Sequence, residues 1–517
     1  MTGKRSRGAV GLRPVAYVLF FAVLSLVSRR AAAEKVVSIA DGWQVYTDGR
    51  MGGFASYTRG DGYPQQTFDQ KIDLATGQPA TDMTTGAPLL TSVHTPLQGA
   101  GFSGAPMLLH QVDPNLTPGA QVFDQGTIDT WRMRSGFIGN VLGFGVRGQL
   151  TPYTKIITYI QIWSFIENDG RVRSTRSQPD IRQGWAKLEG PWGAFAAGRV
   201  RGLFSRGASD INVLYAHRWG VGWPGSIGNI GPTQGMVGFG VLGSGFSSAF
   251  VYTTPSLGGL KLDVGVYDPA VLPAFGAWNR TKLPRPEAEL TFERGFANGW
   301  GKVVLFANGA YQKVYKDGAC TPTVDGDTIV QTSAGPRTVP GTNVTIGCDA
   351  TVAGAGYGGR LELGIFHLGL AGHYGQGIGL NYALQADQAA QDFLGNLRTI
   401  AGWYGQMQVV LGKFDLFAGA GLAQIFMTEF DKKHRRLDPR YDPSVAPLAE
   451  EWSIPKFQLG INGGIVFNAT PFVHFDLDVF RAQASWYGTN NRDNSGALFP
   501  AEKQVVWAYN GGMTVNW

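Results

Sequence analysis

The chain has 517 residues, of which 16% are charged and 74 are glycine, with a formal net charge of +6. Residues 1 to 33 hold six basic residues and no acidic ones, so the rest of the chain carries 44 − 6 = 38 basic residues against 38 acidic ones. A neutral remainder gives no support to nucleic-acid binding, and no stretch after residue 33 has the ~18 uninterrupted apolar residues of a membrane-spanning helix.

The N-terminus has the composition of a secretory signal peptide. Four basic residues precede an apolar run from Val15 to Val27, and "AAAE" offers a cleavage site after Ala33. We therefore predict a signal peptide over residues 1–33 and a single mature domain over 34–517. The alternative is a retained anchor helix. The run is short for a membrane span, although Arg29 and Arg30 before the cleavage site are atypical.

Sixteen segments of the mature chain read as β-strands, because apolar side chains recur at every second position. In the last segment Val505, Trp507, Tyr509 and Met513 share one face, opposite small and polar residues. The predicted strands are 42–57, 130–148, 153–165, 182–189, 193–199, 245–254, 259–267, 286–293, 300–315, 351–366, 368–383, 397–411, 414–429, 452–467, 471–487 and 503–517.

The connections between these strands alternate in length. Long polar loops, such as 58–129 and 200–244, alternate with short turns such as "EGPWG" and "NATP". This asymmetry and the even number of strands are typical of an outer-membrane barrel. We predict an all-β fold: a transmembrane antiparallel β-barrel of about 16 strands, with long extracellular loops. The alternative is a secreted soluble sandwich or propeller. The aromatic strand that ends the chain favours the barrel.

The chain has two cysteines, Cys320 and Cys348, which flank a polar stretch rich in Gly, Pro and Thr. Two thiols that close one loop of an exported chain predict a disulfide. A zinc site is not expected, because two cysteines without a nearby histidine cannot complete tetrahedral coordination.

Two segments resemble strands of the Gram-negative general diffusion porins. "RQGWAKLEGPWGAFAAGR" (Arg182 to Arg199) is similar to the fourth and fifth strands of that family, which precede the loop that narrows the pore. "FVYTTPSLGGLKLDVGVY" (Phe250 to Tyr267) resembles the next hairpin. The chain departs from the family in its long 58–129 loop and in Trp517, which replaces the customary terminal Phe. The loop after Arg199 also lacks the acid-rich glycine motif of enterobacterial porins.

The resemblance implies a trimeric, water-filled channel in the outer membrane of a Gram-negative bacterium. The expected function is passive diffusion of small hydrophilic solutes and ions, with no enzymatic activity, no cofactor and no metal. The expected partners are membrane lipid, lipopolysaccharide, two further copies of the chain, and the barrel-assembly machinery, which would read Trp517 as the assembly signal. The alternatives are a solute-specific channel for a sugar or an anion, and a receptor or enzyme barrel without a through-path.

The segment after Arg199 is the predicted constriction loop, because it follows the fifth strand and mixes charges with aromatics. Its candidate residues are Arg199, Arg201, Arg206, Asp210, Tyr215, His217, Arg218 and Trp219. The predicted pore wall adds Arg132, Arg134, Arg147, Arg182, Asp476 and Asp478.

Two interpretations of this charge pattern remain open. The loop arginines oppose one acid, Asp210, and basic rings favour anions in pores, so we expect a mild anion preference. Alternatively, the arginines pair with Glu289, Glu293 or other acids across the lumen, which leaves a neutral pore. Tyr215 and Trp219, with Trp223, could instead form a track for sugars, because aromatic faces pack against pyranose rings.

Two further patterns carry less weight. The pattern Gly-x-Gly-x-x-Gly occurs three times, as in "GFGVRG" (Gly143 to Gly148), but no strand-helix-strand unit accompanies it. We interpret these glycines as positions that ease strand bending or close packing. A hydrolase would need a serine and a histidine held together, and nothing local brings His373 and Ser485 together.

Overall fold

The computed structural model describes most of the chain after residue 34. The described residues are 35–39, 42–61, 68–70, 90–92, 127–134, 139–164, 179–212, 236–272, 278–296, 299–316, 320, 322–324, 326, 328–332, 335–339, 345–384, 390–392, 395–434, 455–487 and 503–517. The predicted signal peptide lies outside these residues.

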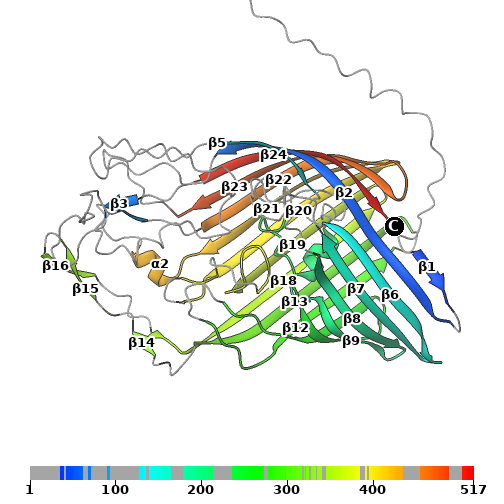
Figure 1. The fold of residues 1–517 in the computed structure, drawn as a ribbon, viewed down its shortest axis with the longest axis horizontal. Helices are drawn as coiled ribbons and strands as arrows, with labels where there is room; N and C mark the ends of the chain where they lie inside the picture. Colours follow the sequence, from blue (N-terminus) through cyan, green and yellow to red (C-terminus); the bar gives the residue numbers. More distant parts are fainter. Residues whose placement is uncertain are drawn as a thin grey trace, which may run out of the picture.

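The main sheet closes into an antiparallel barrel, in which each strand pairs with its neighbour along the chain and the last strand, β24, pairs with β2 (Figure 1). Its strands are β2 (Gln44–Asp61), β5 (Thr127–Arg134), β6 (Asn140–Thr151), β7 (Thr154–Ser164), β8 (Asp180–Gly190), β9 (Gly193–Arg201), β10 (Phe246–Thr253), β11 (Leu260–Tyr267), β12 (Arg285–Gly295), β13 (Gly301–Tyr315), β18 (Asp349–Leu363), β19 (Phe366–Gln376), β20 (Thr399–Leu411), β21 (Phe414–Phe426), β22 (Pro455–Asn468), β23 (Val473–Trp486) and β24 (Lys503–Asn516).

β5 and β6 occupy a single position in this barrel. β6 pairs with the first part of β2, and β5 pairs with its last part on the same edge. Together they correspond to the predicted strand 130–148, so the barrel has the sixteen strands that the sequence predicts. One boundary is wrong. The predicted strand 368–383 ends at Gln376, because the chain turns at Gly377, which has a φ of +69°.

The two ends of the barrel differ. One end carries short turns and the C-terminus, together with β1 (Lys35–Ser38), which pairs with β2. The other end carries the long connections (Figure 1), and long loops mark the extracellular end of outer-membrane barrels. Small elements in these connections are the pairs β3 (Phe68–Gln70) with β4 (Leu90–Ser92), β14 (Thr323–Val324) with β17 (Thr345–Ile346) and β15 (Thr328–Thr332) with β16 (Gly335–Val339), and the helices α1 (Arg206–Ile211) and α2 (Glu429–His434).

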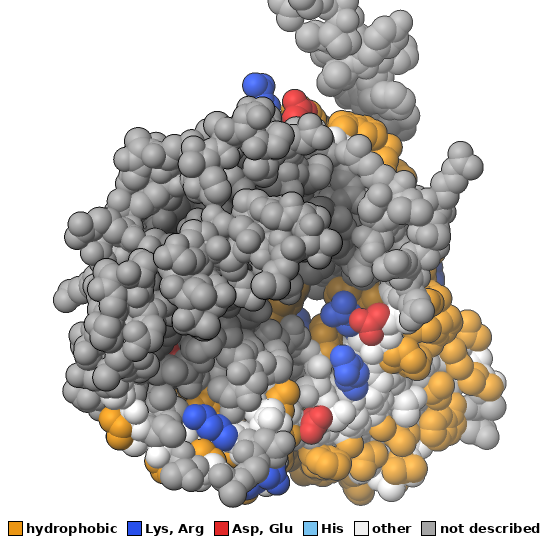
Figure 2. Space-filling model, turned by 60° about the vertical axis from the view of Figure 1, so that its left-hand side comes forward, with side chains coloured by type: hydrophobic (Ala, Val, Ile, Leu, Met, Phe, Trp, Pro, Cys, Tyr) orange, Lys and Arg blue, Asp and Glu red, His pale blue; other side chains and the backbone are white. Residues whose placement is uncertain are grey.

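The outer surface of the barrel is apolar, as the strand periodicity predicts. Leu477 on β23 is 63% exposed and Trp507 on β24 is 40% exposed, whereas Asp476 and Ala508, which point inward, are buried. Figure 2 shows hydrophobic side chains gathered along the lower right edge of one face, with acidic and basic side chains close to one another inside this edge. This outer surface fits lipid, and it places the barrel in an outer membrane. No helix among the described residues is long and apolar enough to cross a membrane.

Closure and the disulfide both follow the sequence predictions. The backbone N–H of Trp517 donates to the carbonyl of Gly49 at 3.0 Å, and the N–H of Gly49 donates back at the same distance. A Cβ at Gly49 would overlap the Trp517 ring, so the glycine makes room for the terminal aromatic. Cys320 and Cys348 form a disulfide with a Cα–Cα distance of 5.6 Å, just before β18.

Segments between strands fold into the barrel and form a second apolar core there. Phe204 and Leu242 from the connection after β9 pack with Ile378, Leu384 and other residues of the connection after β19. In this cluster they pack with inward side chains of the barrel wall that are 0% exposed: Val314, Val352, Ile400, Ala423 and Ile425. A neighbouring cluster joins Met236, Val237, Phe239 and Val241 with further wall residues that are 0% exposed: Phe480, Ala482, Ala484, Val506 and Ala508. Part of the lumen is therefore filled.

Candidate channel constriction

The segment after β9 enters the barrel and is hydrogen-bonded to the inner wall. The backbone N–H of Phe204 donates to Glu287 Oε2 at 2.8 Å, and the N–H of Gly207 donates to Glu289 Oε2 at 2.7 Å. Farther along the segment, the carbonyl of Ala208 accepts a hydrogen bond from the Tyr404 hydroxyl. These bonds fix α1 against the wall that β12, β13 and β18 to β20 form, as the sequence prediction of a constriction loop requires.

Arg206 is held between two acids of this wall. Its Nη2 pairs with Asp263 Oδ2 on β11, and its Nε donates to Glu289 Oε1 on β12 at 2.7 Å. Burial alone would lower the pKa of Arg206, but Glu289 and Asp263 raise it above its ordinary value. Arg206 therefore stays charged, and the two carboxylates compensate its charge.

The edge of α1 that faces the lumen carries a second ion pair. Arg201 Nη2 pairs with Asp210 Oδ1. Next to this pair, Arg360 on β18 donates from Nη1 to the Asp210 carbonyl at 3.5 Å. The Nε of Arg360 also pairs with Glu362 at 2.9 Å. The Asp210 side chain is 51% exposed, so it is the most accessible charged group of this edge.

The other predicted loop residues are not part of this arrangement. Arg199 is exposed, and it lies on the outward face of β9 because its cross-strand partner is Ser248, which shares a face with the outward Phe250. Its Nε donates to the carbonyl of Arg182 at 3.2 Å. The prediction that Arg199 lines the pore is not supported. Four further candidates lie outside the described residues: Tyr215, His217, Arg218 and Trp219.

The predicted pore-wall residues fall into three groups. Arg147 lies on β6 and Arg182 lies on β8, and both side chains are half-buried on the inner side of the barrel. Asp476 and Asp478 point inward but are only 2% and 4% exposed, and Asp478 accepts a hydrogen bond from Asn510 at 2.8 Å. The backbone positions of Arg132 and Arg134 pair with the inward Ser56 and Phe54, but their side chains lie outside the described part of the chain.

The ion pairs of the described lumen give no excess of positive charge. Seven cations (Arg182, Lys187, Arg201, Arg206, Arg285, Lys302 and Arg360) pair with eight acids (Asp180, Glu189, Asp210, Asp263, Glu289, Glu287, Glu293 and Glu362). The interpretation in which arginines pair across the lumen is therefore correct for Arg206, whose partner Glu289 the sequence analysis named.

The exposed fraction of inward side chains shows where the lumen remains open. We call the inner faces of β10 to β13 and β18 to β24 the covered wall, because most of their inward side chains are buried at the level of α1. We call the inner faces of β6 to β8 and of residues 44–48 of β2 the open wall. There the inward residues Asp48, Gln161 and Trp185 are half-buried. Among the described residues, the open wall is therefore the part of the inner surface that keeps polar and aromatic side chains partly exposed at this level.

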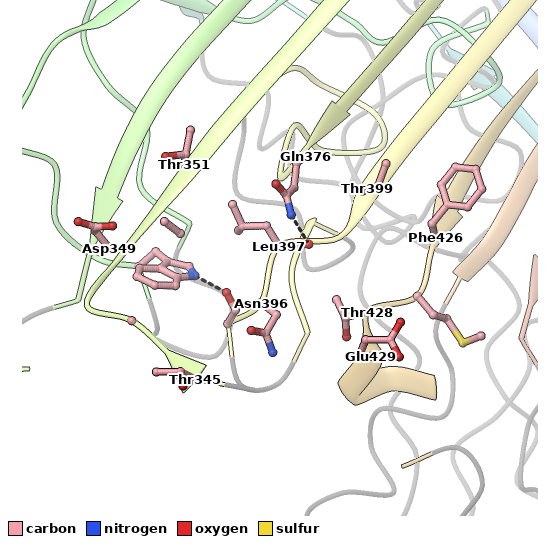
Figure 3. Close-up of a pocket in the computed structure, with 15 residues that line it drawn as sticks. Thr345, Asp349, Thr351, Gln376, Asn396, Leu397, Thr399, Phe426, Thr428 and Glu429 are labelled. Carbon is pink, nitrogen blue, oxygen red and sulfur yellow. Dashed lines mark hydrogen bonds between the residues drawn. The ribbon is translucent and has the colours of Figure 1, made fainter. Parts of the chain in front are cut away.

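A separate cavity of about 500 Å³ lies at the extracellular end, between the start of β18, the connection after β19 and α2. Figure 3 shows Thr345, Asn396 and Glu429 around it, with two hydrogen bonds within its lining. Trp278 Nε1 donates to the Gly395 carbonyl at 2.7 Å, and Gln376 Nε2 donates to the Leu397 carbonyl at 3.2 Å. These bonds hold the connection after β19 in place.

That connection is also held by a buried ion pair. Arg398 donates from Nε and Nη2 to the two carboxylate oxygens of Asp431 on α2, both at 2.8 Å, and both side chains are 0% exposed. Thr428 is the N-cap residue of α2. Its backbone N–H donates to Asp431 Oδ2, and its hydroxyl accepts from the Asp431 N–H. This is a capping box, which the sequence "TEFD" encodes.

Sequence reasoning missed the residues of the covered wall that receive the inserted segment, chiefly Asp263, Glu287 and Tyr404. A signal for one of them, Glu287, exists. Glu287 and Glu289 alternate with apolar residues on a strand that faces lipid on its other side, so both acids must point into the lumen. Tyr404 gave no comparable signal, because an inward tyrosine is common in a water-filled barrel.

No protein-family model and no protein with curated annotation matches the sequence. Among solved structures, the chain is similar to the outer membrane channel DcaP of Acinetobacter baumannii, with 11% identity, a TM-score of 0.51, and 95% of this chain and 100% of that chain covered. It also aligns with an anion-selective porin from Comamonas acidovorans, with 10% identity, a TM-score of 0.49, and 92% and 100% covered. The fold is porin-like. At this identity the likeness concerns the fold alone.

Proposed function

We propose that the protein is a passive diffusion channel for small hydrophilic solutes and ions, of the general diffusion porin type. The observation that carries this proposal is the arrangement of the inserted segment, which is fixed to one wall by Glu287, Glu289 and Tyr404 and leaves polar residues half-exposed on the other wall. A receptor or a structural barrel would not require a polar, accessible wall. The expected assembly is a homotrimer that contacts lipid and lipopolysaccharide.

Two parts of the proposal concern processing and assembly. Residues 1–33 would be removed on export, and Trp517 would be read by the barrel-assembly machinery. N-terminal sequencing of purified protein tests the first, with residue 34 as the expected start. Trp517→Phe should preserve the amount of folded barrel in the outer membrane and Trp517→Asp should reduce it, because Gly49 leaves room for an aromatic ring at this position.

Selectivity is the finer part of the proposal. Since Arg201 and Arg206 are compensated, a mild anion preference depends on Arg218, Arg132 and Arg134. Reversal potentials in a salt gradient test it: Arg218→Glu should shift the potential toward cation selectivity, most strongly at low salt, where charges are less screened. An unchanged reversal potential would mean that Arg218 does not lie at the constriction.

The main experiment is a planar-bilayer recording of purified, unheated protein. A channel should give stepwise, ohmic conductance that rises with salt concentration, and liposomes that contain the protein should swell in small sugars. Protein unfolded by heating serves as the control. Correctly folded barrels that insert without any conductance would overturn the channel and favour the receptor alternative.

A further inference from the structure

The inner faces of β2, β6, β7 and β8 carry a ladder of aromatic and amide side chains that are in register across the strands. One row contains Gln183, Gln161 and Asp48, and the next row toward the turns contains Trp185, Tyr159 and Tyr46. Trp163 lies beyond the first row. We call Tyr46, Tyr159, Trp163 and Trp185 the aromatic track.

Two glycines of β6 make this arrangement possible. Gly143 and Gly145 occupy the β6 positions of the two rows, and a Cβ at either would overlap side chains of the neighbouring strands. A Cβ at Gly145 would meet the Tyr46 ring, and a Cβ at Gly143 would meet Asp48 and the Tyr159 hydroxyl. Side chains from β2 and β7 therefore meet above β6, and part of the "GFGVRG" pattern shapes the lumen.

The rings of the track are close to one another and to two cations. The Tyr46 and Tyr159 rings are stacked at a centroid distance of 6.1 Å, and Tyr159 lies 5.5 Å from Trp185. Arg147 lies 5.2 Å from the Tyr46 ring centroid and Arg182 lies 5.0 Å from the Trp163 ring centroid. Tyr46, Tyr159 and Trp185 thus form a nearly continuous row of rings across the strands, and Trp163 lies farther along β7.

Hydrogen bonds within the wall fix how the rings are oriented. Trp163 Nε1 donates to Gln161 Oε1 at 2.7 Å, and Trp185 Nε1 donates to Gln183 Oε1 at 3.3 Å. The Tyr159 hydroxyl donates to Asp48 Oδ1 at 2.8 Å, and Gln183 Nε2 donates to Gln161 Oε1 at 3.0 Å. Because the polar edges of the rings are bonded within the wall, a solute would find them already oriented, which lowers the entropy cost of binding.

The track lies across the lumen from the inserted segment. β7 and β19 are opposite each other, since seven barrel positions separate them in either direction: β8 to β13 and β18 one way, and β20 to β24, β2 and the shared β5 and β6 position the other way. α1 packs against β13, β18 and β19. α1 therefore lies on the side of the lumen opposite β7 and faces Tyr159, Trp163 and Trp185, all of which are half-buried.

Charge decides which solutes this path would favour. Arg182 pairs with Asp180 and Lys187 with Glu189, while Asp48 and Arg147 have opposite charges on the same wall. Because charges of both signs lie beside the rings of the track, an ionic solute gains little electrostatic advantage from Arg147 and Arg182. Ring faces pack against the apolar faces of sugar rings, and fixed amides and a carboxylate can exchange hydrogen bonds with hydroxyl groups.

We propose that the aromatic track binds neutral, polyhydroxylated solutes, namely mono- and oligosaccharides, as they pass the constriction. This inference rests on the proposed channel function and adds a solute class to it. The binding is weak and reversible, because Tyr159, Trp163 and Trp185 remain partly open to water, and it raises the local concentration of sugar opposite α1.

The test is a planar-bilayer titration of the open channel with maltose and maltotriose, with polyethylene glycol of matched hydrodynamic size as a control. The sugars should reduce the ion current with a saturable concentration dependence and add current noise, whereas polyethylene glycol should reduce it without saturation. Trp185→Ala should raise the half-blocking concentration about tenfold, the factor that ~1.4 kcal/mol of lost contact produces, and Trp185→Phe should restore most of the affinity. Trp403→Ala, on the outer surface, should leave the titration unchanged.

The outcomes separate the two proposals. If the channels conduct ions but respond to sugars as they do to polyethylene glycol, the aromatic track does not bind sugars. The proposed channel function would remain. Absence of any conductance from heat-modifiable, folded protein would overturn the channel itself. If benzoate blocks the current saturably and maltotriose does not, the track recognises flat anionic rings, and the assignment to sugars is wrong. If Trp185→Ala fails to fold, the comparison of maltotriose with polyethylene glycol on the unmodified channel still decides the question.

Discussion

The covered wall and the open wall belong to one barrel and have the same alternation outside, yet they differ inside. On the covered wall, inward positions such as Ile400, Ala423 and Val506 are apolar and 0% exposed, because inward-folded segments pack on them. On the open wall, the corresponding positions are amides, aromatics and charges that remain half-buried. An inward apolar residue in a water-filled barrel therefore marks a place where another segment covers the wall.

This difference gives each wall its own role. The covered wall makes close backbone contacts with the segments packed on it, as in a soluble core, and the buried ion pair of Arg398 and Asp431 holds one of these segments. The open wall uses hydrogen bonds between exposed side chains, which orient groups without removing them from water. Mutations on the covered wall should destabilise the segments packed on it and so change the size of the pore. Mutations on the open wall should change the affinity for solutes while the stability of the fold stays the same.

The largest effect should come from breaking the ion pair that anchors the connection after β19. Arg398→Leu leaves Asp431 buried without its partner, which costs ~3–5 kcal/mol. We expect the connection to leave the lumen, so that the folded barrel becomes sensitive to protease between β19 and β20 and its current becomes noisier. The double variant Arg398→Leu/Asp431→Leu should be less affected, and Lys432→Ala, in the exposed pair with Glu429, should change little. Resistance of Arg398→Leu to protease would show that apolar packing alone holds the connection.

A second variant tests whether the covered wall sets the pore size. A Cβ at Gly421 would overlap the Phe239 carbonyl, so Gly421→Ala must displace residues 236–243 at a cost of ~1–3 kcal/mol. Single-channel conductance should fall, because the added methyl group pushes the segment away from the wall and narrows the lumen. Gly463→Ala, on the outer face of β22, is the matched control and should conduct like the unmodified protein. Equal conductance of the two variants would mean that residues 236–243 do not limit the path.

Much of the barrel could be predicted from the sequence. The packing of the segments that fold into the lumen could hardly be predicted. Alternation gave all sixteen strands because each must face lipid with one side, and this constraint acts on every residue of a strand. The end of β19 was misjudged because Ile378 and Leu380 continue the apolar alternation while packing inside the barrel. Arg206 was recognised as a constriction residue, but its compensation by Asp263 depends on contacts between strands far apart in the chain.

A smaller effect is expected from the charge at the edge of α1. Asp210→Asn leaves Arg201 without its acidic partner at a half-exposed position that faces the lumen. The reversal potential in a salt gradient should move modestly toward anion selectivity, more at 0.1 M than at 1 M salt, because screening shortens the Debye length from ~10 to ~3 Å. Glu429→Gln, in the exposed pair on α2, is the control for a change of the same charge away from the constriction. A shift of equal size in both variants would mean that the general field of the extracellular end, and not the edge of α1, sets selectivity.

The smallest effect should come from the disulfide, which lies outside the barrel. Cys320 and Cys348 close the connection between β13 and β18, whereas the barrel is held by interstrand hydrogen bonds and its lipid-facing side chains. The double variant Cys320→Ser/Cys348→Ser should therefore assemble, run as a heat-modifiable band and conduct like the unmodified protein, while the connection itself becomes more sensitive to protease, because an open loop loses the entropic constraint that the bond places on it. Intact mass before and after alkylation establishes that the bond forms in protein purified from cells. Loss of assembly in the double variant would show that this connection, although it lies beyond the ends of the strands, must be closed before β13 and β18 can pair.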